Sequence, residues 1–432
     1  MNNIRLYPHQ KEGLKQVEDL NRVAFYWDMG LGKTFVGAEK IIQLGSHINL
    51  VVCQKSKIED WQDHFLSFYK DIVIFNLTEK SEFEKFFEII GNHKKQIIGI
   101  INYDLIFRRK ELLKLSDFTL LLDESSLIQN EKAKRSKFVL SLKPKNIILL
   151  SGTPTGGKYE RLWSQLHLLG WNISKDMFYN HYVDYHWDDS EGFPIMIIDG
   201  YKNEDRLKNK MRQYGCRFLK TEDVFDLPEK TDIPVVIPTT SDYKKFRKNS
   251  IVEFKHNGTD IELIGATTLT QFLYERQLCG QYNNEKLNAF KDLVESTNDR
   301  LIVFYNFNEE LIALREIAKE CNRESGFING SGRSMYAYEC CKDGITFVQY
   351  QAGAMGLNLQ KANKIIYFTP PVSSELFEQS KKRIHRIGQE KPCFYYYLIC
   401  RNSIEQAIYG TLAKRKDYTD ALFKEDLKNS NQ

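Results

Sequence analysis

The residues from Trp27 to Thr34, Trp-Asp-Met-Gly-Leu-Gly-Lys-Thr, constrain this chain more than any other stretch. They follow an apolar run, residues 23–26, that predicts a buried strand, and they lead into residues 35–42, which predict the start of a helix. In such an arrangement glycines let backbone N–H groups turn toward an anion, the helix N-terminus adds its positive dipole end, and a lysine adds a full charge. The stretch therefore predicts a site for a nucleotide polyphosphate. The alternative is a glycine turn with an exposed lysine.

Each residue of this loop has a specific expected part. Gly30 and Gly32 give the backbone its freedom, Lys33 supplies the charge, and Thr34 supplies the hydroxyl that magnesium needs. Trp27 stands where the common eight-residue phosphate-loop pattern has a glycine. The loop is therefore an incomplete match to that pattern, and its flanking strand and helix carry the interpretation.

Composition bounds the class of protein. A chain of 432 residues with 42% hydrophobic residues is long enough for about two or three domains, and a formal charge of +4 neither demands nor excludes nucleic acid. Its eight cysteines include no C-x-x-C pair and no His-Cys cluster at zinc spacing, so we expect reduced thiols. The first residues have no apolar signal core, and no apolar run reaches the ~20 residues of a membrane span. Together these features favour a soluble cytoplasmic protein.

Apolar runs alternate with helical patterns throughout the first half of the chain. This alternation predicts a parallel sheet covered by helices on both faces, whose ligands lie at the carboxyl ends of the strands. The runs lie at residues 48–53, 72–75, 97–101, 120–122 and 147–150.

A pair of acids, Asp123 and Glu124, directly follows one of these runs. A carboxylate at the end of a buried strand loses solvation unless a cation or hydrogen bonds compensate it, and the magnesium of a bound nucleotide would do so. We therefore expect Asp123 on the metal side and Glu124 facing the terminal phosphate, where it can orient or deprotonate the attacking water. The alternative is an acid pair that faces solvent.

The second half repeats the alternation without a phosphate loop of its own. Its apolar runs are residues 301–305, 345–348, 365–368 and 394–399, and two prolines around residues 235–237 predict an edge strand there. The sequence Gln-Ser-Lys-Lys-Arg-Ile-His-Arg begins at Gln379. On a helix, Gln379, Arg383 and Arg386 would share one face. Arginines on one stripe suggest fingers that stabilise charge on a transferred phosphoryl group, and a solvated basic helix is the alternative.

These motifs resemble the Swi/Snf-type branch of helicase superfamily two over nearly the whole chain. The resemblance rests on Gln10, the loop, the acid pair with Asn130, the Ser151–Pro154 turn (Ser-Gly-Thr-Pro), and Q-x-x-x-R-x-H-R-I-G-Q from residue 379. In this superfamily the shorter G-x-G-K-T loop is the usual form. Three positions depart from the family, Ser126 where histidine is usual, Trp27 in front of the loop where aspartate is usual, and Ala354 where glycine is frequent. The reduced motifs also resemble compact prophage or viral members.

The resemblance implies an α/β fold of two tandem RecA-like domains, residues 1–228 and 229–432. It implies a DNA-dependent ATPase that uses ATP and Mg²⁺ and moves along duplex DNA by backbone contacts, as a monomer. The implied catalytic residues are Lys33, Asp123, Glu124, Arg383 and Arg386, with Thr34 and Asp123 at the metal. The implied nucleotide-binding residues are Gln10, Asp28, Met29, Gly30, Leu31, Gly32, Lys33, Thr34, Gly356 and Gln379. The implied nucleic-acid contacts are Lys55, Ser56, Tyr103, Thr153, Asn306 and Gly353.

Three alternatives remain open from the sequence. A strand-separating helicase of the same superfamily is the nearest. A nucleic-acid-binding scaffold with ATP as a structural ligand is motivated by Trp27, Ser126 and Ala354. A phosphate-loop kinase or small-molecule ATPase would need a substrate pocket and no paired arginines. A further stretch, residues 171–200, is aromatic and acidic, and we expect a surface excursion packed by its own aromatics rather than a nucleic-acid contact.

Overall fold

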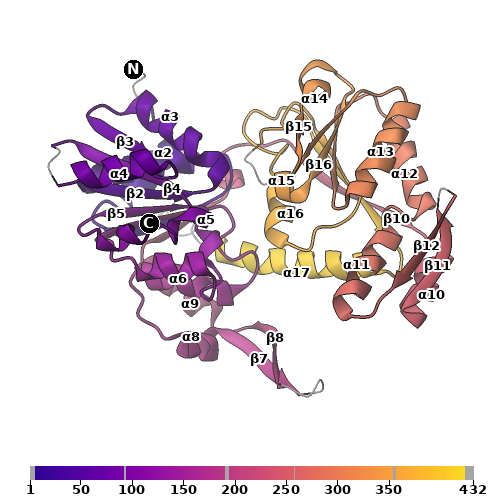
Figure 1. The fold of residues 1–432 in the computed structure, drawn as a ribbon, viewed down its shortest axis with the longest axis horizontal. Coiled ribbons are helices and arrows are strands. Elements are labelled where there is room, and N and C mark those ends of the chain that lie inside the picture. The colour runs from indigo at the N-terminus through magenta and orange to yellow at the C-terminus, as the bar shows by residue number, and fades with distance from the viewer. Residues whose placement is uncertain (1–4, 92–93, 190–193, 257, 354–356, 424–432) are drawn as a thin grey trace. The chain divides into compact units, whose positions relative to one another are not determined.

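The computed structural model describes residues 5–91, 94–189, 194–256, 258–353 and 357–423. Contacts divide the chain into two units, one of residues 1–224 with 417–432 and the other of residues 225–416. Each unit is built on its own seven-stranded sheet (Figure 1). The sheets are mostly parallel and flanked by helices, which confirms the expected α/β class.

The first unit contains α1 (Pro8–Lys15), β1 (Arg22–Trp27), α2 (Lys33–Leu44), β2 (Ile48–Cys53), η1 (Lys55–Lys57), α3 (Ile58–Phe68), β3 (Ile72–Asn76), α4 (Lys80–Ile89), β4 (Gln96–Asn102), α5 (Tyr103–Ile106), η2 (Lys110–Lys114), β5 (Thr119–Asp123), η3 (Ser125–Ile128), α6 (Lys134–Ser141), β6 (Asn146–Ser151), η4 (Tyr159–Leu162), α7 (Trp163–Leu168), α8 (Lys175–Tyr182), β7 (Val183–Asp188), β8 (Ile195–Tyr201), α9 (Glu204–Gln213), β9 (Cys216–Leu219) and η5 (Thr221–Asp223).

The strand order of the first sheet brings the sequence motifs to one edge. Its strands run β3-β4-β2-β5-β6-β1-β9, and every pairing is parallel. The strands that precede the glycine loop (β1), the acid pair (β5) and the Ser151–Pro154 turn (β6) are therefore neighbours. Parallel strands end at the same edge of a sheet, so these three motifs lie together. They do so although Asp28 and Asp123 are 95 positions apart in the sequence.

Helix α2 packs unusually close to this sheet because it contains a glycine. A Cβ at Gly37 would lie 2.8 Å from Leu150 Cδ1 and 3.0 Å from Leu121 Cδ1, which is closer than real Cβ atoms approach. Gly37 thus brings the helix that follows the loop down onto β5 and β6, and it holds the N-terminus of α2 beside the ends of those strands.

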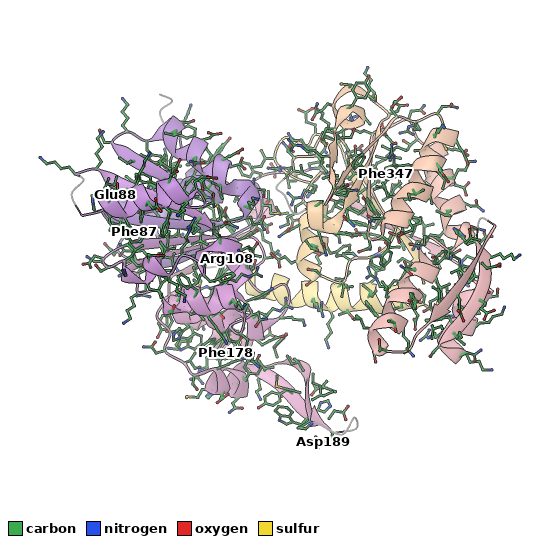
Figure 2. The ribbon with its side chains drawn as sticks, in the orientation of Figure 1. Phe87, Glu88, Arg108, Phe178, Asp189 and Phe347 are labelled. Atoms are coloured by element: carbon green, nitrogen blue, oxygen red, sulfur yellow. The ribbon has the colours of Figure 1, made fainter. Side chains whose placement is uncertain are left out.

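The aromatic segment at 171–200 divides into a core part and an exposed part. Trp171, Phe178 and Tyr182 are buried in the core of the first unit, whereas Trp187 on the β7–β8 hairpin is 59% exposed. The hairpin extends away from α8, and its strand β7 leads to Asp189 (Figures 1 and 2). The expected packing of this segment by its own aromatics is confirmed for residues 171–182, where the rings of Trp171, Phe178 and Tyr182 contact one another. The expectation of a surface excursion is wrong there, because these rings are part of the domain core.

The second unit contains β10 (Lys230–Ile237), α10 (Ser241–Asn249), β11 (Ile251–His256), β12 (Thr259–Ile264), α11 (Thr268–Cys279), α12 (Asn284–Glu295), β13 (Leu301–Tyr305), α13 (Asn308–Glu320), β14 (Ser325–Asn329), β15 (Gly332–Ser334), α14 (Tyr336–Cys340), β16 (Ile345–Gln349), α15 (Tyr350–Gly353), β17 (Lys364–Tyr367), α16 (Ser374–Lys381), β18 (Cys393–Cys400) and α17, which is Ile404–Phe423 and passes out of this unit after Lys416.

The second sheet runs β10-β18-β17-β13-β16-β14-β15, with only β14–β15 antiparallel among its pairings. Strand β10 lies at one edge, which confirms the edge strand predicted from the prolines. Two apolar clusters form the interior, and Phe347 of β16 belongs to one of them (Figure 2).

A buried carboxyl, Glu310 on α13, organises the ends of β13 and β17. Its Oε2 accepts hydrogen bonds from Asn306 N at 2.8 Å, Phe307 N at 3.1 Å and Thr369 Oγ1 at 3.0 Å. Burial raises the pKa of Glu310 from 4.5 to about 7, and these hydrogen bonds and the Lys286 charge only partly oppose the shift. The folded chain therefore holds a proton here that the unfolded chain loses at lower pH.

This proton makes stability depend on pH. Between pH 4.5 and about 7 the folded state binds the extra proton, so the free energy of unfolding falls as pH rises through this window. Glu310→Gln should abolish that fall, because an amide does not ionise while its oxygen still accepts hydrogen bonds from these donors. We expect the variant to gain up to about 3 kcal/mol over wild type between about pH 5 and about pH 8, measured by urea unfolding. Glu316→Gln, on the exposed face of α13, is the control, and equal pH dependence in all three proteins would contradict the prediction.

Candidate active site

The glycine loop begins where β1 ends. Gly30 and Gly32 have φ of 89° and 73°, in the left-handed region that favours glycine, and Gly32 is the N-cap residue of α2. Lys33 Nζ donates to the carbonyl oxygens of Trp27 at 2.8 Å and Asp28 at 3.0 Å. The loop geometry that the sequence predicted is therefore present, with its lysine folded back along the loop.

Trp27 is the last residue of β1 and not part of the loop. Its side chain is 1% exposed, and a Cβ on Gly13 of α1 would lie 2.3 Å from the indole ring. The ring thus packs against α1 at a point where only glycine fits. A tryptophan replaces the glycine of the common pattern at this position because the side chain packs in the core. The loop itself needs only Gly30 and Gly32.

Gln10 of α1 lies directly against the loop. Its Nε2 donates to Leu31 O at 3.2 Å, its Oε1 accepts from Tyr7 N at 2.9 Å, and its side chain is 3% exposed. A Cβ at Gly32 would meet Gln10 Nε2 at 2.2 Å. The structure therefore brings Gln10 to the nucleotide loop, from about twenty residues upstream.

The loop is supported on its other side by Thr221, a residue that no sequence motif singles out. Asp28 Oδ2 accepts from Thr221 N at 3.2 Å and from its hydroxyl at 3.5 Å, and the same hydroxyl lies 3.4 Å from Met29 O. Thr221 follows β9, which pairs with β1. This neighbour in the sheet supplies polar partners for Asp28, which is 8% exposed.

The acid pair ends β5. Asp123 Oδ2 accepts from Trp61 Nε1 at 2.9 Å, and the Tyr103 hydroxyl donates to Asp123 O at 2.9 Å. Burial raises the pKa of Asp123, while the indole hydrogen bond and the charges of Lys33 and Lys57 lower it. A carboxylate that is costly to keep ionised beside the phosphate-loop lysine fits the residue expected to hold a nucleotide's divalent cation.

Glu124 has a left-handed backbone, with φ of 57° and ψ of 59°. This conformation is unfavourable for a residue with a Cβ, and such strain gathers at functional sites. It turns the chain sharply from β5 into η3, so Asp123 and Glu124 do not continue the alternation of a strand. The two acids can thus serve different parts of one ligand.

Trp61 is a positioning residue that pattern reading missed, and it provides a test. Trp61→Phe keeps the buried ring but removes a hydrogen bond that lowers the Asp123 pKa. The Asp123 pKa should therefore rise, and the acid limb of the ATPase pH profile should move to higher pH. The measurement is kcat/KM for ATP against pH. Trp163→Phe is the control, because its indole donates to Ile173 O at 2.9 Å. An unmoved acid limb in Trp61→Phe would contradict this role.

Gln165 of α7 connects the acid motif to the Ser151–Pro154 turn. Its Oε1 accepts from Ser125 Oγ at 2.7 Å and from Tyr26 OH at 3.1 Å, and its Nε2 donates to Pro154 O at 2.8 Å. The side chain is fully buried. One amide thus spans β1, the segment after the acid pair and the segment after β6.

The expected nucleic-acid contacts of the first unit divide into exposed and buried groups. Lys55 and Ser56 lie in η1 and are exposed. Tyr103 is 2% exposed with its hydroxyl bonded at the acid motif, and Thr153 is 8% exposed. The ring of Tyr103 belongs to the domain core, so its side chain offers little surface to nucleic acid, and the contact expected there stays a prediction. The Thr153 side chain is similarly enclosed.

The single helical stripe predicted for the second unit is wrong. Helix α16 ends at Lys381, so Gln379 lies within it while Arg383 and Arg386 lie in the turns that follow. Leu359 N donates to Arg383 O at 3.1 Å, and this long-range bond captures a carbonyl that a continuing helix would use. The three side chains cannot share one helix face.

Each of these three side chains has its own surroundings. Gln379 is 6% exposed and its Nε2 lies 3.4 Å from Glu375 Oε1. Arg383 is 1% exposed, and its Nη1 donates to Leu357 O at 3.3 Å. Arg386 is partly buried, and this burial lowers its pKa. His385 Nε2 lies 2.9 Å from Pro228 O.

The other expected residues of the second unit are spread along its strand ends. Asn306 donates its amide to Thr369 Oγ1 at 2.8 Å and Pro370 O at 3.0 Å, so its side chain joins two strand-end loops rather than facing solvent. Gly353 ends α15. Gly356 and Ala354 lie outside the described residues.

A group of possible metal ligands also forms in this unit. The potential ligand atoms of Cys279, Cys400 and Glu405 lie within 4.8 Å of one another, and all three residues are buried. Glu405 already pairs with buried Lys286 at 2.6 Å, and burial raises the pKa of the Cys279 thiol. These contacts describe a buried ion pair beside thiols and not a metal centre. None of the eight cysteines forms a disulfide. Within the part of the chain that the structure describes, no helix qualifies as a candidate membrane span.

A glycine loop follows β1, a non-edge strand of a parallel sheet, and an acid pair follows the nearby strand β5. These features define a phosphate-loop protein of the α/β class. Here it also has a second unit built on a mostly parallel sheet. The SNF2-related domain matches residues 9–284, and the helicase conserved C-terminal domain matches residues 285–388. The chain therefore belongs to the SNF2-related family of helicase superfamily two.

Similar curated proteins include the ISWI chromatin-remodeling complex ATPase ISW1 of Saccharomyces cerevisiae, 24% identical over 94% of this chain and 39% of that protein. The putative ATP-dependent helicase/translocase YwqA of Bacillus subtilis is 23% identical over 98% of this chain and 49% of that protein. The chain spans about two fifths to three fifths of the length of such relatives. A solved structure, the Sulfolobus solfataricus SWI2/SNF2 ATPase core in complex with dsDNA, is 21% identical over 98% of this chain and 94% of that one, with a TM-score of 0.44.

Proposed function

We propose that this protein is a DNA-dependent ATPase that moves along duplex DNA. The observation that carries the proposal is the meeting of the glycine loop and the acid pair at one edge of the first sheet, in a chain of the SNF2-related family. Two relatives, a chromatin-remodeling complex ATPase and a putative helicase/translocase, are named as motors of this kind, which supports the proposal. Neither a kinase nor a small-molecule ATPase would account for the match through residue 388.

We propose residues 1–228 as the ATP-binding lobe. Lys33 and the loop amides bind the phosphates, Gln10 lies on the side of the adenine, and Glu124 holds the attacking water. Thr34 and Asp123 would hold Mg²⁺, which neutralises charge on the phosphates when bound. Asp123 suits this part because a cation offsets the cost of keeping a buried carboxylate ionised.

We propose residues 229–432 as the second lobe, with Arg383 and Arg386 as the residues that stabilise charge on the transferred phosphoryl group. Closure of the lobes would then gate hydrolysis. Exposed Lys55 and Ser56 are candidates for DNA backbone contacts. Such contacts imply weak sequence preference and strong salt dependence. We also propose that the chain acts as a monomer in the cytoplasm, where its eight free thiols would stay reduced.

The test is the ATPase rate with duplex DNA, single-stranded DNA, forked DNA and RNA at fixed salt, with Lys33→Ala as the inactive control. Strongest stimulation by duplex DNA, without strand displacement, supports the translocase. Displacement of a labelled strand from forked DNA would support the strand-separating helicase, which the helicase names of relatives also favour. Equal DNA-stimulated phosphate release by wild type and Lys33→Ala would support a scaffold with structural ATP and reject both motors.

A further inference from the structure

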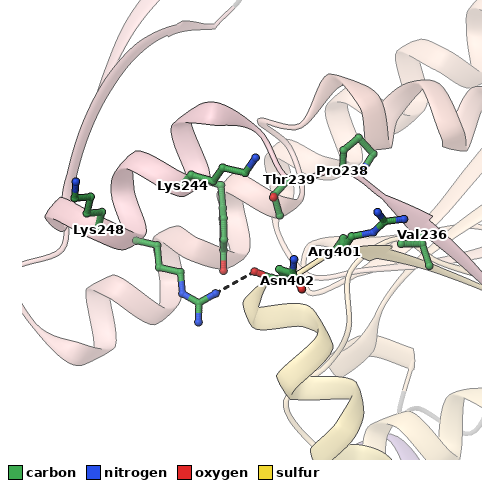
Figure 3. A pocket seen from close by; sticks show the side chains of 9 residues that line it. Val236, Pro238, Thr239, Lys244, Lys248, Arg401 and Asn402 are labelled. Atoms are coloured by element: carbon green, nitrogen blue, oxygen red, sulfur yellow. Dashed lines mark hydrogen bonds between the residues drawn. The ribbon is translucent and has the colours of Figure 1, made fainter.

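A basic pocket lies in the second unit, away from every motif of the family. It has a volume of about 570 Å³ and is lined by Lys244, Arg247 and Lys248 of α10 and by Arg401 and Asn402, which follow β18 (Figure 3). The three cations of α10 are at i, i+3 and i+4, so they share one helix face. Arg401 lines the same pocket from a segment more than 150 residues later in the chain, and its side chain extends toward Val236 (Figure 3).

The charge of this pocket is uncompensated. Lys244, Arg247, Lys248 and Arg401 are exposed, and within the described part of the chain none of them forms an ion pair. The nearest acid of the helix, Asp242, pairs at 3.5 Å with Lys245, which does not line the pocket. The half-buried Glu275 accepts a hydrogen bond at 2.8 Å from the hydroxyl of Tyr243, a buried residue of the pocket lining. Four clustered cations that form no ion pair among the described residues attract anions.

The pocket is also held in shape. Arg247 Nη1 donates to Asn402 O at 3.0 Å, and Ile404 N donates to Tyr243 OH at 2.8 Å. These bonds tie α10 to the turn between β18 and α17, so both walls keep their spacing. Arg247 is occupied in this way, and Lys244, Lys248 and Arg401 remain to meet a ligand.

We propose that this basic pocket binds phosphates of a DNA backbone and is an accessory DNA contact outside the conserved motifs. The inference rests on the proposed function, because a motor that moves along DNA presents a polyanion to this lobe. Its open form and its separate cations suit successive phosphates on a strand better than one compact anion.

The experiment compares Lys244→Gln/Lys248→Gln with a control, Lys245→Gln/Lys342→Gln, which removes the same charge from exposed positions outside the pocket. Duplex DNA binding is measured without nucleotide at several salt concentrations. Each lost phosphate contact should reduce the slope of log K against log salt by about 0.9, so the pocket variant should lose about 1.8. Its deficit relative to wild type should be about tenfold larger at about 50 mM than at about 200 mM salt. Adding Arg401→Gln should reduce the slope further.

Equal salt slopes and equal DNA affinities for the pocket and control variants would overturn the inference. Weakened ATP binding with unchanged DNA binding would also overturn it, because the ligand of the pocket would then be a free nucleotide. Thermal unfolding checks that the variants are folded, and these exposed positions should leave Tm unchanged. If wild type binds DNA but DNA does not stimulate its ATPase, the proposed function fails while the pocket is still tested by the slopes.

Gln165 carries a second inference, independent of the pocket. The usual histidine of the acid motif is absent here, and Ser126 in its place is fully buried. The adjacent Ser125 instead donates to Gln165, whose other end donates to Pro154 O. We infer that Gln165 is the positioning residue that couples the acid motif to the Ser151–Pro154 turn, so that nucleotide state and DNA contact influence each other. This inference also rests on the proposed function.

The test uses the ratio of DNA-stimulated to DNA-free ATPase rates. Gln165→Leu and Ser125→Ala should each reduce that ratio about tenfold, and the double variant should resemble the singles because both break one link. Tyr26→Phe is the control, since it removes a hydrogen bond to the same amide without touching either motif. A proportional fall of both rates, with a lower Tm, would mean that Gln165 is only structural and would overturn the coupling role, as would additive losses. Absence of stimulation in wild type would instead reject the proposed function.

Discussion

Glu124→Gln should bind ATP with nearly wild-type affinity and hydrolyse it about 10² to 10⁴ times more slowly. The substitution keeps the size of the side chain and the backbone position after β5, but an amide cannot accept a proton from water. Affinity should survive because the phosphate loop and Asp123 stay intact. Single-turnover hydrolysis measures the rate, and titration with a fluorescent nucleotide measures the affinity.

The control for this prediction is Glu111→Gln, an exposed glutamate of η2 in the same unit. It should match wild type in both measurements. Normal turnover by Glu124→Gln would remove the water-positioning role. A large loss of affinity with a normal rate would mean that this carboxylate organises the nucleotide and not the water.

Arg386→Ala should lower the maximal DNA-stimulated rate about 10³ to 10⁵-fold with little change in nucleotide affinity, if it stabilises charge on the transferred phosphoryl group. The partly buried guanidinium extends from a turn and not from a helix stripe. Steady-state kcat and nucleotide affinity are measured together. Arg333→Ala, exposed on β15, is the control. A large affinity loss with a normal maximal rate would reject this role.

The same kinetic measurements, together with thermal unfolding, distinguish the role of Arg383 from that of Arg386. Arg383 is 1% exposed, and its guanidinium donates to Leu357 O within the fold. Arg383→Ala should therefore lower Tm as well as the rate, because it removes a buried, hydrogen-bonded cation. Arg386→Ala should leave Tm close to wild type. Similar Tm losses in both variants would assign both arginines to the architecture of the second unit.

The parts of the site that the sequence predicts correctly are those that depend on residues adjacent in the chain. The strand before the loop, the left-handed glycines and the helix start each follow from a few adjacent residues, and all are present. The predicted strands of both sheets are present for the same reason, since a continuous apolar run reports burial on both faces. The Arg383–Arg386 stripe failed because helical periodicity says nothing about where a tertiary bond ends a helix.

The sequence by itself determined the class of fold, the phosphate loop and the acid pair, because backbone conformation and hydrophobic periodicity depend on neighbours in the chain. The tertiary structure decided which side chains meet there. Trp61 reaches Asp123 from 62 residues away, and Gln165 reaches Tyr26 from 139 residues away, because the order β2-β5-β6-β1 makes distant strands adjacent. Strand order depends on the packing of the whole sheet. The loop that began as an incomplete pattern is thus explained by Gly13 and Trp27, which pack α1 against β1.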